Sequence, residues 1–179
     1  KYKRREVRPP TTDDYQFLRT KPTEQALVTK RHDSDYYLID KETGENFLIE
    51  LKIGGDLDNK KARSEKEALL EQFAILSNTL PDKTKIKVFF ATAYNRFGEG
   101  KPWRQERVRQ FFADDELLIG KDFWDFVCKS DQGYNIVLEA YKESFTKYFG
   151  SANSYKITWR NNILPIYNDR FSNIEMMFQ

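Results

Sequence analysis

Two carboxylates and a lysine lie where a hairpin of two strands would bring them together. Asp35 begins one strand-like run, and Glu50 and Lys52 end the next. The polar segment 41–45 between the runs contains a glycine and has the length of a hairpin turn. Folding about this turn places Asp35 opposite the end of the second strand. Glu50 and Lys52 are two positions apart and therefore point to the same face of the sheet. The sequence predicts two carboxylates and one ammonium at a single spot.

This combination suits the hydrolysis of a phosphodiester bond. Asp35 and Glu50 could hold a hard divalent cation, and the Leu51 carbonyl could add a ligand. The expected cation is Mg²⁺, for which Mn²⁺ could substitute. Such a cation neutralises charge at the phosphate and lowers the pKa of bound water. Lys52 could orient or deprotonate the attacking water, or stabilise the developing negative charge. We expect in-line attack by that water, leaving a 5′-phosphate.

The same pattern leaves alternatives open. A Glu-x-Lys pair on a strand is also typical of a surface ion pair worth less than ~1 kcal/mol. Asp33 shares strand parity with Asp35 and rivals it as the first carboxylate, although Asp33 lies farther from the predicted lysine. Glu67 and Glu71, on the helix expected to follow, could add an acidic group to the site.

The elements that would position these residues form a mixed α/β fold, a sheet flanked by helices. Apolar residues at spacings of three and four predict a helix over 59–78, and the run 85–93 predicts a buried central strand. Further helices are expected at 104–112, 122–127 and 135–149, and short strands at 25–31 and 155–159. We expect a nuclease domain over 1–150 that begins with a loosely structured basic arm, and an extension, 151–179, packed on the same domain.

Basic residues suggest where a nucleic acid would bind. The candidates are Lys60 and Lys61 at the start of the long helix, Asn95 and Arg96 in the loop after the central strand, and Lys101, Arg104 and Arg107 beyond it. Arg104 and Arg107 would share one face of the predicted helix. They could clamp phosphates or contact guanine, and the alternative is a solvated helix face.

Composition narrows the chemistry. The 179 residues include 30 Lys and Arg against 28 Asp and Glu, so the net charge of +2 excludes a bulk polycation. One cysteine and one histidine exclude an internal disulfide and make a histidine-rich metal site or a Ser-His-Asp arrangement unexpected. Oxygen ligands must therefore dominate any metal site. The single cysteine, Cys128, suits a reducing cytoplasm and is expected in the core.

An aspartate ahead of one strand, Glu-Leu-Lys closing the next, then a helix and a buried strand together resemble the PD-(D/E)xK nuclease fold. More narrowly, three stretches are similar to the TdeIII-like type II restriction endonucleases: Phe47–Lys52, Phe89–Asn95 and Leu118–Phe126. Ser34, rather than a proline, precedes Asp35.

The resemblance implies a Mg²⁺-dependent endonuclease that cuts double-stranded DNA at a short palindrome as a homodimer, in the cytoplasm of a prokaryotic host. It makes Asp35 and Glu50 the metal ligands and Lys52 the catalytic lysine. Two other functions stay open: a repair or recombination nuclease of the same fold, such as a resolvase, and a DNA-binding module that does not cleave.

Overall fold

The computed structural model describes residues 7–20 and 33–149. Their contacts divide them into two compact units. The first unit comprises 7–20, 33–92 and 105–118, and the second comprises 93–104 and 119–149. The predicted strands at 25–31 and 155–159 and the predicted extension 151–179 lie outside the described residues, so the expected division into domains stays a prediction.

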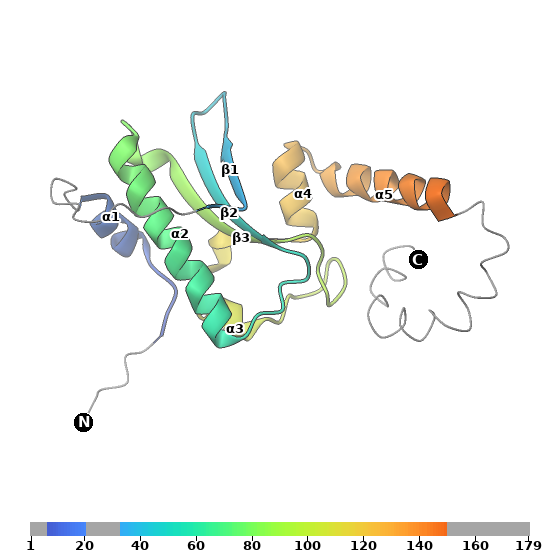
Figure 1. Cartoon of the computed structure of the whole chain (residues 1–179), viewed down its shortest axis with the longest axis horizontal. Helices are drawn as coiled ribbons and strands as arrows, with labels where there is room; N and C mark the ends of the chain where they lie inside the picture. The colour runs from blue at the N-terminus through green and yellow to red at the C-terminus, as the bar shows by residue number, and fades with distance from the viewer. Residues whose placement is uncertain (1–6, 21–32, 150–179) are drawn as a thin grey trace. The chain divides into compact units, whose positions relative to one another are not determined.

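The first unit holds all but the last residue of a mixed four-stranded sheet, which confirms the predicted α/β class (Figure 1). Its strands, in spatial order, are β1 (Tyr36–Ile39), β2 (Asn46–Lys52), β3 (Ile86–Thr92) and β4 (Leu117–Ile119). β1 and β2 form the predicted antiparallel hairpin, whereas β2 and β3 run parallel. The three-residue β4 was not predicted, because it is too short to show a periodic pattern.

The hairpin turn is fixed by local hydrogen bonds. Asp40 Oδ1 accepts from the backbone N–H of Glu42 at 2.8 Å, and the carbonyl of Asp40 accepts from Gly44 N at 2.8 Å. Gly44 has φ +72°, a left-handed conformation that costs glycine little. The turn sets the register of the hairpin and so decides which side chains meet at its open end.

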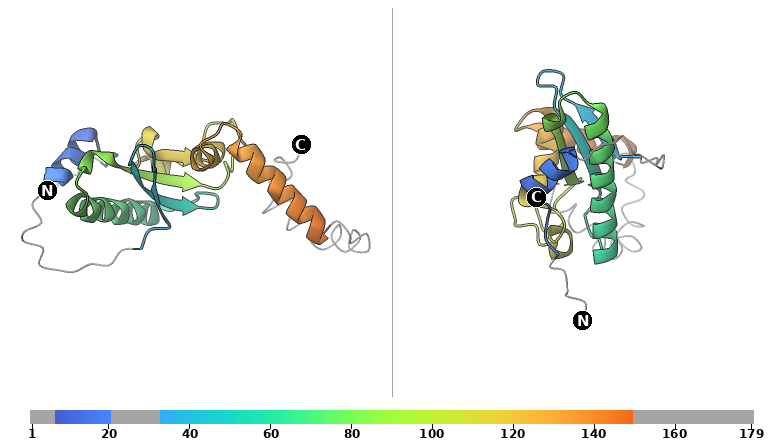
Figure 2. Two further views of the ribbon diagram at one scale, coloured as in Figure 1. Left: turned by 90° about the horizontal axis from the view of Figure 1, so that it is seen from above. Right: turned by 90° about the vertical axis from the view of Figure 1, so that its left-hand side faces the viewer.

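Helix α2 (Asn59–Thr79) packs against β2 and β3, and the prediction of a helix over 59–78 is confirmed (Figure 2). The carboxylate of Asp58 caps the helix by accepting from Lys61 N at 2.8 Å. Two side chains of the helix, Leu69 and Phe73, are completely or almost completely buried. Pro81, just past the end, cannot continue the helix.

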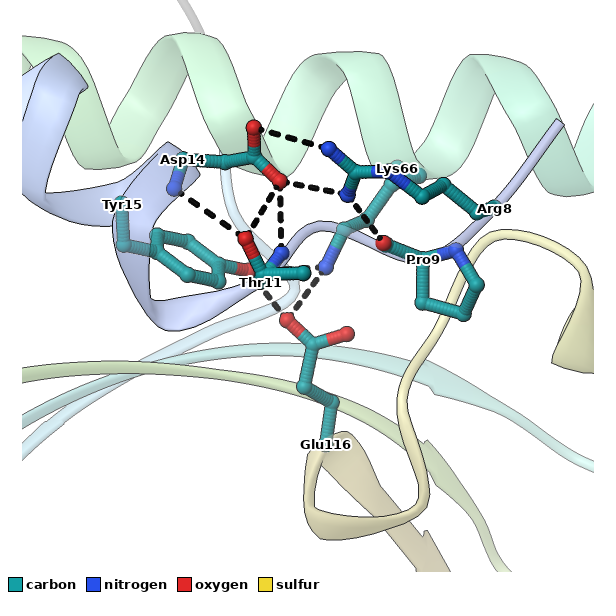
Figure 3. Close-up of polar contacts among 7 residues, drawn as sticks. All are labelled: Arg8, Pro9, Thr11, Asp14, Tyr15, Lys66 and Glu116. Carbon is teal, nitrogen blue, oxygen red and sulfur yellow. Dashed lines mark hydrogen bonds and ion pairs between the residues drawn. The ribbon is translucent and has the colours of Figure 1, made fainter. Parts of the chain in front are cut away.

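Helix α1 (Thr12–Thr20) corrects the expectation of a loosely structured arm over this part of residues 1–31. Thr11 and Asp14 cap it reciprocally: Thr11 N donates to Asp14 Oδ2 at 2.7 Å, and Asp14 N donates to Thr11 Oγ1 at 3.4 Å. Arg8 adds an ion pair to the same carboxylate at 2.6 Å (Figure 3). Thr-x-x-Asp is a helix-start signal that the sequence contained.

A buried polar network joins α1 and α2 to the short 3-10 turn η2 (Asp114–Glu116), as Figure 3 shows. Lys66 Nζ donates to Glu116 Oε1 at 2.5 Å and to the Tyr15 hydroxyl at 2.8 Å, and that hydroxyl donates to Glu116. Glu116 Oε2 accepts from Ala113 N at 2.8 Å. Burial lowers the pKa of Lys66, although the attraction of Glu116 opposes this shift. Through Lys66, the network ties the first half of α2 to α1 and to η2.

The second unit contains α4 (Lys121–Cys128) and α5 (Gly133–Phe149), which confirm the helices predicted at 122–127 and 135–149. Trp124 Nε1 anchors α4 by donating to the carbonyl of Ala93 at 2.7 Å. Cys128 is exposed in the last turn of α4, so its predicted place in the core is wrong. No helix in the described ranges is both long enough and apolar enough to cross a membrane.

Candidate active site

The open end of the hairpin brings the predicted carboxylates and lysine together. Tyr36 lies opposite Ile49, so Asp35 falls beside the last residues of β2. Asp35 Oδ2 accepts a hydrogen bond from the backbone N–H of Leu51 at 3.0 Å. This bond ties the chain ahead of β1 to the end of β2 and holds the aspartate beside Glu50 and Lys52.

The ammonium of Lys52 lies among three carboxylates. It donates a hydrogen bond to Glu50 Oε1, lies 3.1 Å from Glu65 Oε1 and lies 4.0 Å from Asp35 Oδ2. Glu65 comes from α2 and was not predicted. A spacing signal existed, because Glu65 falls between the buried Ala62 and Leu69 at intervals of three and four.

The other acidic candidates, Asp33, Glu67 and Glu71, are not among the carboxylates that contact Lys52 in the described chain. Glu67 pairs with Arg63 one turn away on α2, at 2.7 Å. The backbone carbonyl of Asp33 accepts from Gln72 Nε2 at 3.3 Å, while it is Asp35 whose carboxylate reaches the lysine. The geometry therefore favours Asp35 over Asp33.

Burial changes the protonation equilibria at the site. Glu50 is only 8% exposed, and this burial raises its pKa to about 7. Repulsion from Glu65 and Asp35 adds to the rise, whereas the hydrogen bond and attraction of Lys52 oppose it. Burial works against the charge on Lys52, but the hydrogen bonds and attraction of Glu50 and Glu65 outweigh it and raise the lysine pKa. A Glu50 buried to this extent does not fit the alternative of an ordinary surface ion pair.

The donor set fits a hard divalent cation that keeps part of its shell for other ligands. Among the residues that the structure describes, no three carboxylate, imidazole or thiol groups form a ready metal cluster. Asp35 and Glu50 supply two carboxylates, and Mg²⁺ in phosphate-processing sites typically takes one or two, with water and phosphate oxygens completing its shell. The residues present therefore suit Mg²⁺ better than a cation that needs an all-protein cage.

Three of the predicted DNA contacts lie in the first unit. Lys60 and Lys61 are exposed in the first turn of α2, and Arg107 is exposed on α3 (Glu106–Arg109). The basic helix is shorter than predicted, because Gln105, with φ −96° and ψ 72°, is not helical. Arg104 precedes α3, so the prediction that it shares a helix face with Arg107 is wrong.

The remaining candidates lie in the loop of the second unit. Lys101 and Arg104 are exposed, and the Arg96 guanidinium lies 5.9 Å from the centre of the Phe97 ring. Asn95 is buried: its Nδ2 donates to the carbonyl of Lys101 at 2.7 Å, and its Oδ1 accepts from Phe97 N at 3.0 Å. The Asn95 side chain thus shapes the loop, a role that the sequence did not reveal.

The family model described as "Type II restriction endonuclease, HinfI" matches residues 11–144. This range includes Asp35, Glu50 and Lys52 and most of the described chain. The chain therefore belongs to this family of type II restriction endonucleases, enzymes that hydrolyse the phosphodiester bonds of DNA at specific sites. Comparison with curated proteins and with solved structures gives no significant match.

The family match confirms the prediction of a type II restriction endonuclease acting on double-stranded DNA. It decides against the resolvase-like nuclease and against the module that binds without cutting. The narrower likeness to the TdeIII-like enzymes stays a prediction. Enzymes of the type II class generally use a divalent metal ion, which agrees with the donor set at the end of the hairpin.

Proposed function

We propose that this restriction endonuclease is Mg²⁺-dependent and that Asp35, Glu50 and Lys52 form its catalytic site. The observation that carries the proposal is the convergence of the three side chains from the two strands of one hairpin. Asp35, Glu50 and the Leu51 carbonyl would hold the cation. Mn²⁺ would substitute for Mg²⁺, because it prefers the same oxygen ligands.

The protein groups divide the work. When bound, Mg²⁺ supplies a Lewis acid that offsets the negative charge of the reacting phosphate. Lys52 orients the attacking water or stabilises negative charge at the phosphate oxygens through its ammonium hydrogens. Asp35 also accepts a hydrogen bond from the backbone of Leu51, so the geometry of the site depends on this contact at the open end of the hairpin.

DNA binding on this proposal uses five exposed basic residues, Lys60, Lys61, Lys101, Arg104 and Arg107, together with the partly buried Arg96. These side chains would neutralise phosphates or contact bases, and Asn95 would keep its loop in shape. The TdeIII-like motifs support a short palindromic site. A palindrome is matched by a two-fold symmetric enzyme, so we propose that the chain acts as a homodimer in the cytoplasm.

Digestion of plasmid DNA tests this function. With Mg²⁺, the wild-type protein should give discrete fragments whose ends carry 5′-phosphates and whose cuts are symmetric on the two strands. Excess EDTA should stop the reaction, and Mn²⁺ should restore it. Cleavage that persists in EDTA, or cuts without two-fold symmetry, would count against the metal or the palindrome respectively.

A further inference from the structure

Helix α2 contributes a fourth charged side chain to the site, Glu65. Its Oε1 lies 3.1 Å from Lys52 Nζ, and the side chains of both residues are about three-quarters buried, with 26% and 28% exposed. We propose that Glu65 is a positioning residue that holds the Lys52 ammonium in place for the reaction. This inference rests on the proposed role of Lys52 in catalysis.

The fold holds Glu65 toward the sheet from both directions along α2. Asp58 fixes the start of the helix by capping it. Ala62 and Leu69, one turn before and one turn after Glu65, are completely buried. The next residue, Lys66, is locked by its ion pair with Glu116 at 2.5 Å (Figure 3). A helix pinned at these points has little freedom to rotate, so the Glu65 carboxylate is directed at the end of β2.

Lys52 needs such a partner because its two other carboxylates have a second task. Asp35 and Glu50 are the proposed metal ligands, and oxygens that serve a cation are weaker acceptors for the lysine. In the described chain, three carboxylates contact Lys52, and Glu65 is the one that is not a proposed metal ligand. With all three carboxylates ionised and Lys52 protonated, the group carries two negative charges, which one divalent cation balances.

Two substitutions separate positioning from a direct or purely electrostatic role. Glu65→Met keeps the length and removes the acceptor, whereas Glu65→Gln keeps an acceptor oxygen and removes only the charge. Glu67→Met is the matched control, because Glu67 lies on the same helix, is 56% exposed and pairs with Arg63. Steady-state cleavage of a DNA containing the site would be measured at saturating Mg²⁺, and Mg²⁺ binding to each full chain would be measured by calorimetry.

The positioning role predicts a specific pattern. Glu65→Met should lower kcat about 10- to 100-fold, the usual cost of losing a group that orients a reacting group, with little change in KM for DNA. Glu65→Gln should recover most of the lost kcat, and Glu67→Met should match the wild type. The Met and Gln variants should bind Mg²⁺ with equal affinity, because both have lost the same charge.

Three results would overturn the inference. Wild-type kcat in Glu65→Met would show that Lys52 needs no partner. A Gln variant as slow as the Met variant would show that the charge matters and the contact does not. Recovery of Glu65→Met by higher Mg²⁺, together with weaker Mg²⁺ binding than in Glu65→Gln, would make Glu65 a metal ligand.

The Gln variant keeps the test decisive if Glu65→Met does not fold, because a loss in Glu65→Gln as large as that in Lys52→Ala would contradict the positioning role. Failure of the proposed function would look different. In that case Lys52→Ala itself would cleave normally, whatever the Glu65 variants do.

Discussion

Glu50 and Lys52 lie side by side at a partly buried position, where the charge on each residue favours the charge on the other. A carboxylate that is 8% exposed is costly when charged, and its pKa of about 7 reflects that cost. Lys52, two residues later on the same face, supplies the compensating charge and a hydrogen bond. Perturbed carboxylates beside a fixed cationic group are typical of functional sites rather than of sites selected for stability.

The choice between the two neighbouring aspartates is tested by matched substitutions. Asp35→Asn should lower the cleavage rate at least about 100-fold, because a neutral amide supports the cation and the site's electrostatics poorly. Asp33→Asn should retain nearly full activity, because its carboxylate is not among those that contact Lys52. Initial rates at saturating Mg²⁺ measure both, and a larger loss in Asp33→Asn would reverse the assignment.

Much of the candidate site followed from strand parity. The alternation of side chains put Glu50 and Lys52 on one face, and the short turn put Asp35 opposite them, so no tertiary information was needed. Glu65 required the rotation of α2 about its axis, which depends on packing against the sheet. The two hydrogen bonds of the Asn95 amide likewise depend on a loop conformation that no periodic pattern encodes.

At the scale of elements, α2 is the part that links the core to the site. Glu65 on this helix contacts Lys52 of the site. The next residue, Lys66, belongs to the buried network with Tyr15 and Glu116. A buried ion pair of this kind is strongly coupled, since removing one partner leaves the other charged and unpaired.

Unfolding measurements test that coupling. Lys66→Met should lower the free energy of unfolding by about 3–5 kcal/mol, because Glu116 would be left buried without its cation. Lys66→Met combined with Glu116→Leu should lose less than the sum of the two single variants. Arg63→Ala, which breaks an exposed pair on the same helix, should cost under about 1 kcal/mol. Urea denaturation would measure all four, and additive losses would contradict the coupling.

The elements differ in how far the sequence determined them. The hairpin has a well-defined turn, α2 carries a pattern of period 3.6, and β3 is a mostly apolar run of seven residues. Helix α1 has no fully buried residue, and β4 has three residues, so their existence depends on contacts made by the folded chain. The start of α3 was predicted at Arg104, two residues before its observed start at Glu106, for the same reason.

At the scale of the whole molecule, the net charge of +2 is the sum of opposed parts. Carboxylates gather at the end of the hairpin, and exposed lysines and arginines lie in both units. An enzyme that holds a divalent cation and a polyanionic substrate needs both signs of charge. The family match extends across both units, which agrees with a function that uses more than the hairpin.

The central claim is that Glu50 and Lys52 of this hairpin carry out the cleavage. Its most direct test is the single-turnover cleavage rate of the full chain at saturating Mg²⁺ for Glu50→Ala and Lys52→Ala. Glu45→Ala, which removes a carboxylate at the other end of the hairpin that pairs with Lys87, is the control. We predict that both site variants still bind DNA but cleave at least about 100-fold more slowly, while the control cleaves like the wild type. Cleavage by both site variants at the wild-type rate would contradict the account.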